Sequence, residues 1–103
     1  MRATMMNYKI EIEKNASEFL TKLSKSQKKA HAKIDIFIHE ILTTCENPCT
    51  LQNAKRLTGF TGNKWRWRLG DYRIIAKVIN DEIKVIKIIK VAKRDESTYK
   101  NLK

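Results

Sequence analysis

The stretch from Trp65 to Ile75 constrains the fold of this chain more than any other. Tryptophan and leucine alternate with arginine up to Leu69, and the dipeptide Gly70-Asp71 then provides a turn of the kind that reverses a β-hairpin. Because side chains alternate between the two faces of a strand, we expect the tryptophans on one face and the arginines on the other. The pattern therefore predicts an antiparallel hairpin with an apolar face toward the core and a guanidinium face that favours phosphate.

The predicted guanidinium face has three members in this hairpin, Arg66 and Arg68 before the turn and Arg73 after it. Arginine keeps its charge and presents a planar fork of donors, so it binds phosphate oxygens in pairs. An ordinary solvated surface would also explain three arginines, but their convergence on one expected face favours an anion site. We interpret this face as a candidate phosphate-binding surface.

The final strand, expected from Ile83 to Val91, determines whether a fourth arginine joins this surface. Both of its faces are partly apolar, which is typical of an interior strand. By alternation, Lys84 and Lys90 share one face, and Arg94 continues it if the strand extends that far. The pattern predicts that Arg94 emerges beside the arginines of the hairpin.

The residues before the hairpin predict one strand followed by two helices. Tyr8 to Ile12 alternates apolar and charged side chains, as a strand does. Asn15 is the expected N-cap of a first helix, and a break near Leu23-Ser24 separates it from a longer second helix that ends before Pro48. The two amphipathic helices should form an antiparallel hairpin that packs on a sheet.

The remaining segments predict connections and not further elements. Apolar periodicity is lost from Cys45 to Asn63, which predicts a loop. We expect a single domain over residues 8–103, preceded by a flexible leader over residues 1–7. Together the elements predict an α+β fold with an N-terminal strand and a two-helix hairpin packed on a mostly antiparallel four-stranded sheet.

The charge of the chain indicates a negatively charged partner. The formal net charge is +11, while 42% of the residues are hydrophobic, as expected of a compact fold. Such an excess favours polyanions such as RNA, DNA, an acidic protein segment or anionic lipid. No apolar run approaches the roughly 20 residues of a membrane helix, so we expect a cytoplasmic protein that makes no membrane contact.

Metal chemistry is not expected from the cysteines. Cys45 and Cys49 have no second pair of cysteines and no nearby histidine, whereas a structural zinc site needs four ligands at suitable spacing. Two reduced thiols at a helix-to-loop junction are the simpler interpretation. We therefore expect neither a metal nor a cofactor.

Three motifs, taken with the order of the elements, resemble one known family. They are Leu57-Thr58-Gly59, the stretch from Trp67 to Ile75, and Lys93-Arg94-Asp95. With the order strand, helix, helix, three strands, they resemble the RelE/ParE superfamily of bacterial toxins from Tyr8 to Tyr99. The resemblance implies a RelE-like fold and a cognate antitoxin whose flexible segment wraps the toxin and covers its basic site. It also implies that any contact with DNA is made through the antitoxin.

The superfamily has two functional branches. RelE-like members cut messenger RNA, typically in the ribosomal A site, whereas ParE-like members inhibit DNA gyrase. RelE-like nucleases carry an arginine just after the last strand and a tyrosine a few residues later, and this chain is similar in having Arg94 and Tyr99. The resemblance therefore favours an endoribonuclease that acts on mRNA at the ribosome. A ParE-like gyrase inhibitor without catalytic activity and a non-catalytic RNA-binding relic are the alternatives.

Metal-independent cleavage of RNA requires a base for the attacking 2′-hydroxyl, positive charge at the phosphate, and an acid for the leaving oxygen. A charged guanidinium stabilises the dianionic transition state, so Arg68, Arg73 and Arg94 are candidates to hold the scissile phosphate. The resemblance implies this role for Arg73 and Arg94. It implies stacking or proton transfer for Tyr99. The other cations expected to bind RNA are Arg66, Lys64 and Lys93.

The general base is left open by the sequence. Where the best-known RelE members carry two lysines before the turn, this chain has Arg66 and Arg68, and an arginine is a poor proton acceptor. His31 and His39 lie off the apolar stripe of the second helix, so we interpret them as solvent-facing. The remaining candidates for the base are Tyr99, Lys64, Lys93 and a group on the ribosome. Asp95 and Glu96 are further alternatives, although surface charge is the simpler interpretation of both.

Overall fold

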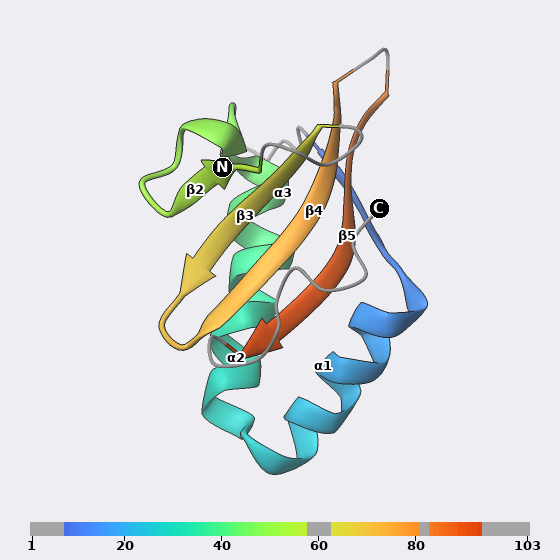
Figure 1. Cartoon of the computed structure of the whole chain (residues 1–103), viewed down its shortest axis with the longest axis vertical. Helices are drawn as coiled ribbons and strands as arrows, with labels where there is room; N and C mark the ends of the chain where they lie inside the picture. The colour runs from blue at the N-terminus through green and yellow to red at the C-terminus, as the bar shows by residue number, and fades with distance from the viewer. Residues whose placement is uncertain (1–7, 58–62, 81–82, 94–103) are drawn as a thin grey trace, which may run out of the picture.

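The computed structural model describes residues 8–57, 63–80 and 83–93, and it shows helices packed on one side of a sheet (Figure 1). In chain order the elements are β1 (Lys9–Ile12), α1 (Lys14–Ser26), α2 (Lys28–Ile36), the π-helical turn η1 (Phe37–Ile41), α3 (Leu42–Thr44), the 3₁₀ turn η2 (Pro48–Thr50), β2 (Ala54–Arg56), β3 (Lys64–Leu69), β4 (Tyr72–Asn80) and β5 (Lys84–Lys93). Within these residues, no helix is both long enough and apolar enough to span a bilayer. The predicted α+β class, with an N-terminal strand followed by helices, is confirmed.

The sheet has five strands in the order β1-β5-β4-β3-β2. Strand β1 runs parallel to β5, and the other neighbouring pairs are antiparallel. The last strand is therefore interior, as its two partly apolar faces predict, and β1 and β2 form the edges. In Figure 1 the helical segment from α2 to α3 lies behind the strands, and α1 is seen beside the end of β5, so that one face of the sheet is covered by helices.

The helix-covered face of the sheet supplies the hydrophobic core. Trp67 is fully buried there, and its indole Nε1–H donates to the carbonyl oxygen of Pro48 at 3.0 Å. Trp65 is half-buried against the same core, which confirms that the tryptophans face inward. The other buried members of the core are Tyr8, Ala16, Leu23, Ile34, Phe37, Ile38, Leu42, Ile74, Ala76, Val78, Ile86, Ile88 and Val91.

The hairpin of β3 and β4 forms in the register that the alternating pattern predicts. Leu69 pairs with Tyr72, so Gly70 and Asp71 alone make the turn. Gly70 has φ of +56°, a left-handed conformation that glycine adopts without the steric cost paid by other residues. This glycine therefore fixes the register that separates the tryptophans from the arginines.

The break between the two helices lies later than predicted. Helix α1 continues through Leu23-Ser24, and Gln27 separates it from α2. The Ser24 hydroxyl donates to the carbonyl oxygen of Thr21 at 2.6 Å, a bond within α1, and it caps no following helix. Leu23 is buried in the core, and packing of this apolar stripe outweighs a weak capping signal.

The start of α1 also differs from the prediction, because Asn15 lies inside the helix. The N-cap residue is Glu13, which makes no side-chain capping bond. Its backbone N–H donates instead to the carbonyl oxygen of Ile88 at 2.8 Å. The position of the helix start is thus set by its attachment to β5, which the local sequence does not reveal.

A fifth strand lies within the segment that was predicted to be a loop. Strand β2 pairs antiparallel with β3, and Lys55 stands opposite Arg66. Leu57, directly after β2, is buried, and its backbone N–H donates to the carbonyl oxygen of Lys64 at 2.9 Å. A strand this short shows no detectable period in the sequence, so the predicted count of four strands is wrong.

Strand β5 contains a bulge that was not predicted. Ile75 pairs with Lys90, but the next residue of β4, Ala76, pairs with Ile88. Ile89 is therefore the extra residue, and it has no direct partner on β4. Because the side-chain period of a strand is two, one inserted residue reverses the alternation beyond it.

The bulge corrects the prediction that Lys84 and Lys90 share a face. Lys84 lies on the helix-covered side, where its ammonium group is 5.7 Å from the centroid of the Tyr8 ring. Lys90 is the partner of Ile75, which lies two residues beyond Arg73 on β4, so it shares the face of Arg73. Lys90 therefore lies on the same face as Arg73 because of the bulge, and not because it continues the face of Lys84.

Candidate nucleic-acid interface

The face of the sheet that points away from the helices is basic, and we call it the basic face. Directly paired residues share a face, so the register defines three rows that cross the strands. The arginine row comprises Arg68, Arg73 and Ala92; the mixed row comprises Lys55, Arg66, Ile75 and Lys90; the lysine row comprises Lys64, Lys77, Lys87 and Glu11. Glu11 is the single acidic residue of the three rows.

The arginine row brings two guanidinium-bearing residues together on the basic face. Arg68 and Arg73 are direct cross-strand partners next to the hairpin turn, Arg68 exposed and Arg73 half-buried. Facing residues of an antiparallel pair have Cβ atoms about 4.5–5.5 Å apart, so both guanidinium groups can reach one phosphate. Arg66 lies two residues before Arg68, about 7 Å along β3, and extends the positive surface.

Asn53 holds the backbone that carries Arg68. The backbone N–H of Arg68 donates to the carbonyl oxygen of Asn53 at 3.0 Å, and the Asn53 side-chain Nδ2 donates to the carbonyl oxygen of Arg68 at 2.9 Å. These two bonds fix the end of β3, and with it the direction in which the Arg68 side chain leaves the sheet. Sequence reasoning missed Asn53 because a single asparagine in an apparent loop carries no periodic signal.

The lysine row places three ammonium groups in line across three strands. Lys64 stands opposite Lys77, which stands opposite Lys87. Lys64 is only 4% exposed, and Lys77 is exposed. Lys87 forms an ion pair with Glu13 at 3.5 Å, but an exposed pair of this kind contributes little. Like charges directly opposite each other are unfavourable in a sheet.

The structure separates the predicted site residues into three groups. Those that lie together on the basic face are Arg66, Arg68, Arg73 and Lys64. Lys93 does not join them, because it pairs with Tyr72, which packs on the helix-covered core. Arg94 and Tyr99 lie outside the described residues, so their places in the site stay predictions.

The hairpin tryptophans offer no stacking platform on the basic face. Trp67 is fully buried on the opposite side, and the indole Nε1–H of Trp65 donates to Oδ1 of Asn63 at 2.9 Å. Both residues alternate with the arginines and so point away from them. Among its described residues, the hairpin therefore presents cations but no aromatic ring on the basic face, which suits contact with phosphates better than recognition of bases.

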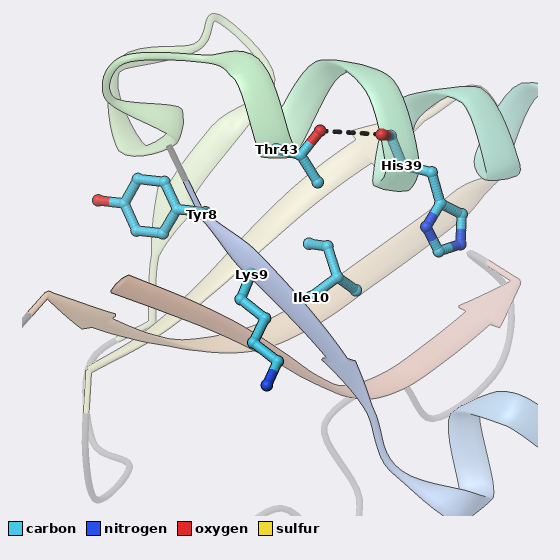
Figure 2. A pocket seen from close by; sticks show the side chains of 5 residues that line it. All are labelled: Tyr8, Lys9, Ile10, His39 and Thr43. Carbon is cyan, nitrogen blue, oxygen red and sulfur yellow. Dashed lines mark hydrogen bonds between the residues drawn. The ribbon is translucent and has the colours of Figure 1, made fainter. Parts of the chain in front are cut away.

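A pocket of about 380 Å³ lies between β1 and the helical segment η1–α3 (Figure 2). It is lined by Tyr8, Lys9, Ile10, His39 and Thr43, and the Thr43 hydroxyl donates to the carbonyl oxygen of His39 at 2.8 Å. The His39 imidazole is exposed and lies 3.7 Å from Asp35, in agreement with the predicted solvent-facing position. Strands β5 and β4 separate β1 from β3, so His39 cannot supply a base at the arginine row.

The two cysteines are free thiols that lie half-buried near Tyr8. Burial, helped by the proximity of Cys45, raises the pKa of the Cys49 thiol. Burial and then the neighbouring Cys49 and Cys45 raise the pKa of Tyr8. Within residues 8–57, 63–80 and 83–93, no three metal-ligating side chains cluster. The environment of Cys49 keeps it protonated, as in a packing role.

Comparison with known proteins identifies the class of the chain. The model of the family described as the ParE toxin of the type II toxin–antitoxin system parDE matches residues 10–98. The chain belongs to this family, and so to the RelE/ParE superfamily of type II toxins. The toxin–antitoxin complex RelBE2 from Mycobacterium tuberculosis contains a similar chain, with a TM-score of 0.67 and 23% identity over 85% of this chain and 99% of that one. This similarity shows the RelE-like fold; among curated proteins, no sequence matches.

Proposed function

We propose that this toxin is a metal-independent endoribonuclease that cuts messenger RNA at the ribosomal A site and thereby arrests translation in the cytoplasm. The observation that carries the proposal is the direct opposition of Arg68 and Arg73 on a face that also holds Arg66. Guanidinium groups that converge on one point suit a phosphate whose negative charge increases in the transition state. A surface built only for non-specific attraction would need no such pairing.

Each step of the proposed reaction has a candidate group. The 2′-hydroxyl of one nucleotide attacks the adjacent phosphorus, and Arg68 and Arg73 stabilise the resulting dianionic transition state. Arg94 is proposed to add a third guanidinium, and Tyr99 to stack on a base or to transfer a proton. Of the two lysines proposed as the base, Lys64 lies on the basic face but about 13 Å along β3 from Arg68, and Lys93 lies on the opposite face, so the identity of the base stays open.

We propose that the toxin is held inactive by a cognate antitoxin encoded beside it. The similar chain of known structure comes from a toxin–antitoxin complex, and membership of the ParE family supports the same assembly for this chain. An acidic segment that folds on binding would complement a surface with net charge +11. The proposed inhibition is competition, because carboxylates on the arginine row would exclude phosphate.

The second candidate is inhibition of DNA gyrase by binding alone. The match to a family described as ParE toxins favours this candidate. A gyrase inhibitor would not depend on two guanidinium groups placed for one phosphate, and it would retain its toxicity when they are removed. The third possibility is a relic that binds RNA but has lost cleavage with the exchange of lysines for Arg66 and Arg68.

Mapping of new 5′ ends in bacterial transcripts after induction of the toxin tests the proposal. Wild-type toxin should produce ends within translated codons, and Arg73→Ala should lower their frequency by about 100- to 1,000-fold, the usual cost of one transition-state donor. Arg94→Ala should relieve growth arrest while the fold and antitoxin binding persist. Arg56→Ala is the matched control, since Arg56 is exposed and pairs with Trp65 on the other face.

Three outcomes would contradict the nuclease. Growth arrest without new 5′ ends, accompanied by DNA-damage signalling, would assign the protein to gyrase. Full toxicity of Arg73→Ala and Arg94→Ala would exclude phosphate stabilisation by these arginines. Tight binding of RNA without cuts or growth arrest would identify the relic.

A further inference from the structure

Strand β1 is an edge of the sheet, and two hydrogen bonds show which way its backbone groups point. The backbone N–H of Glu13 donates to the carbonyl oxygen of Ile88 at 2.8 Å, toward β5. The backbone N–H of Tyr8 points to the other side, where it donates to the carbonyl oxygen of Thr43 at 3.1 Å. Because backbone groups alternate in direction along a strand, those of Ile10 point outward, as those of Tyr8 do.

The outward backbone groups of Ile10 and Ile12 are available to another strand. Strand β1 pairs with β5 alone, and within the described part of the chain no backbone group bonds these two residues from the outer side. An edge of this kind is a template for pairing with a second chain.

The charges of β1 are complementary to a second copy of the same strand. Lys9 and Glu11 flank Ile10, and both are exposed on the face that points away from the helices. When two copies pair antiparallel about Ile10, each Lys9 stands directly opposite Glu11 of the other copy. A shift of the centre by one residue in either direction would place Glu11 opposite Glu11 or Lys9 opposite Lys9, so charge selects the register centred on Ile10.

We infer that β1 is a self-association edge, at which a second copy of this chain adds its own β1 antiparallel. The two Ile10 residues then exchange N–H···O bonds, and the N–H of Ile12 reaches the carbonyl oxygen of Tyr8 in the other copy. Thr43 already accepts the N–H of Tyr8, so the ladder ends there. Because β1 has only four residues, the pairing predicts a weak dimer that depends on concentration.

The apolar pocket beside β1 lies where the second strand would bring its central side chain. Ile10 lines the pocket from the strand, and His39 and Thr43 line it from the helical segment (Figure 2). In the inferred pair, Ile10 of the second copy lies on this same face, with the two Cα atoms about 5.5 Å apart. Its side chain therefore reaches the mouth of the pocket.

The alternation of charge favours a second copy over an acidic segment. A strand rich in carboxylates would pair with Lys9 but would set like charges opposite Glu11. The net charge of +11 opposes association of two copies, yet the lysine and the glutamate of β1 cancel each other, and salt at physiological strength screens charges beyond about 8 Å. The inference goes beyond the proposed function, since β5 separates β1 from Arg68 and Arg73.

Sedimentation equilibrium of the full-length toxin in physiological salt tests the inference by charge reversal. Lys9→Glu and Glu11→Lys should each weaken self-association about tenfold or more, although they change the net charge in opposite directions, because each makes both cross-strand pairs like-charged. An equimolar mixture of the two variants should associate more tightly than either variant alone, since every pair then joins a lysine to a glutamate. The matched controls are Lys25→Glu and Glu18→Lys, which make the same charge changes at exposed positions of α1.

Three results would overturn the inference. They are a wild-type toxin that stays monomeric at about 0.5 mM, a dimer that Lys9→Glu weakens no more than Lys25→Glu does, and a mixture that gains no more than the control mixture. A monomeric toxin that binds a glutamate-rich peptide through Lys9 would assign the edge to an acidic partner and not to a second copy. Glu11 also stands opposite Lys87, so thermal unfolding checks that Glu11→Lys is folded, and Lys9→Glu alone decides the test if it is not.

Discussion

The two faces of the central hairpin consist of alternate residues of the same strands, yet one is buried and apolar and the other carries charge beside solvent. On one face Trp67 and Ile74 are partners, both fully buried against the helices. On the other face the neighbouring pair, Arg68 and Arg73, brings two like charges together beside solvent. Burial of the first pair stabilises the fold, whereas direct opposition of like charges, as in the second pair, is unfavourable in a sheet. The two faces of one hairpin therefore differ in both charge and burial.

The largest effect expected from this comparison is that of Trp67→Ala. Removal of a fully buried indole that also donates a hydrogen bond to Pro48 should lower the free energy of unfolding by about 3–5 kcal/mol. The adjacent substitution Arg68→Ala should change it by less than about 0.5 kcal/mol, because Arg68 is exposed. Urea titrations of both variants measure the difference. Equal losses would show that the two faces are not energetically distinct.

A smaller effect on the free energy of unfolding is expected at the turn that sets the register of β3 and β4. Gly70→Ala should cost about 1–2 kcal/mol, because φ of +56° is strained for a residue with a Cβ atom. An added Cβ at Gly70 would meet no other atom within 4 Å, so the cost comes from the backbone alone. Gly70→Asn is the control, since asparagine tolerates this conformation better. Thermal unfolding of the three proteins should rank glycine first, asparagine second and alanine last.

The basic face should become more stable when one of its charges is removed. Lys77→Gln relieves repulsion from Lys64 and Lys87 and should raise the free energy of unfolding by about 0.2–1 kcal/mol at low salt. The gain should shrink as salt screens the row. Lys25→Gln on α1 should produce no comparable gain. A destabilised Lys77→Gln variant would mean that the lysine contributes packing, and the comparison of the faces would then fail.

The smallest expected effect is the dependence of the free energy of unfolding on high pH, through the half-buried Cys49 thiol. Since burial raises the pKa of Cys49 in the folded protein, the unfolded thiol loses its proton first as the pH rises through the ordinary value of 9.0. The folded state then binds more protons than the unfolded state, so stability falls with rising pH in this range. Stability measured from pH 8 to 10 should fall less steeply in Cys49→Ala than in wild type. An unchanged slope would assign the pH dependence to other groups, such as Tyr8.

The elements that the sequence predicts best are those whose signal is local and repeated. The alternation from Trp65 to Leu69 and the turn at Gly70-Asp71 predict the central hairpin, its register and the placement of three arginines. The candidate site is predictable to the same extent, because Arg66, Arg68 and Arg73 belong to that hairpin. For residues outside the hairpin, such as Lys93, the face of the sheet can be assigned only when the pairing of the whole strand is known.

The errors share a physical cause, since each depends on contacts between segments distant in the chain. The start of α1 is set by a hydrogen bond from Glu13 to Ile88, and the short strand β2 exists because β3 lies beside it. The bulge at Ile89 puts Lys84 and Lys90 on opposite faces, although no local pattern marks it. Such features arise from pairing and packing, which override weak local preferences.

The sequence by itself determines that this chain is a basic α+β protein with an arginine-bearing hairpin, because net charge and the alternation of side chains depend only on the local order of residues. The tertiary structure alone decides that Lys64, Lys77 and Lys87 stand in one row and that Asn53 holds Arg68. Strand register connects residues far apart in the chain, and no local pattern specifies it fully. The basic face becomes a surface, with rows at defined spacing, only when those strands pair.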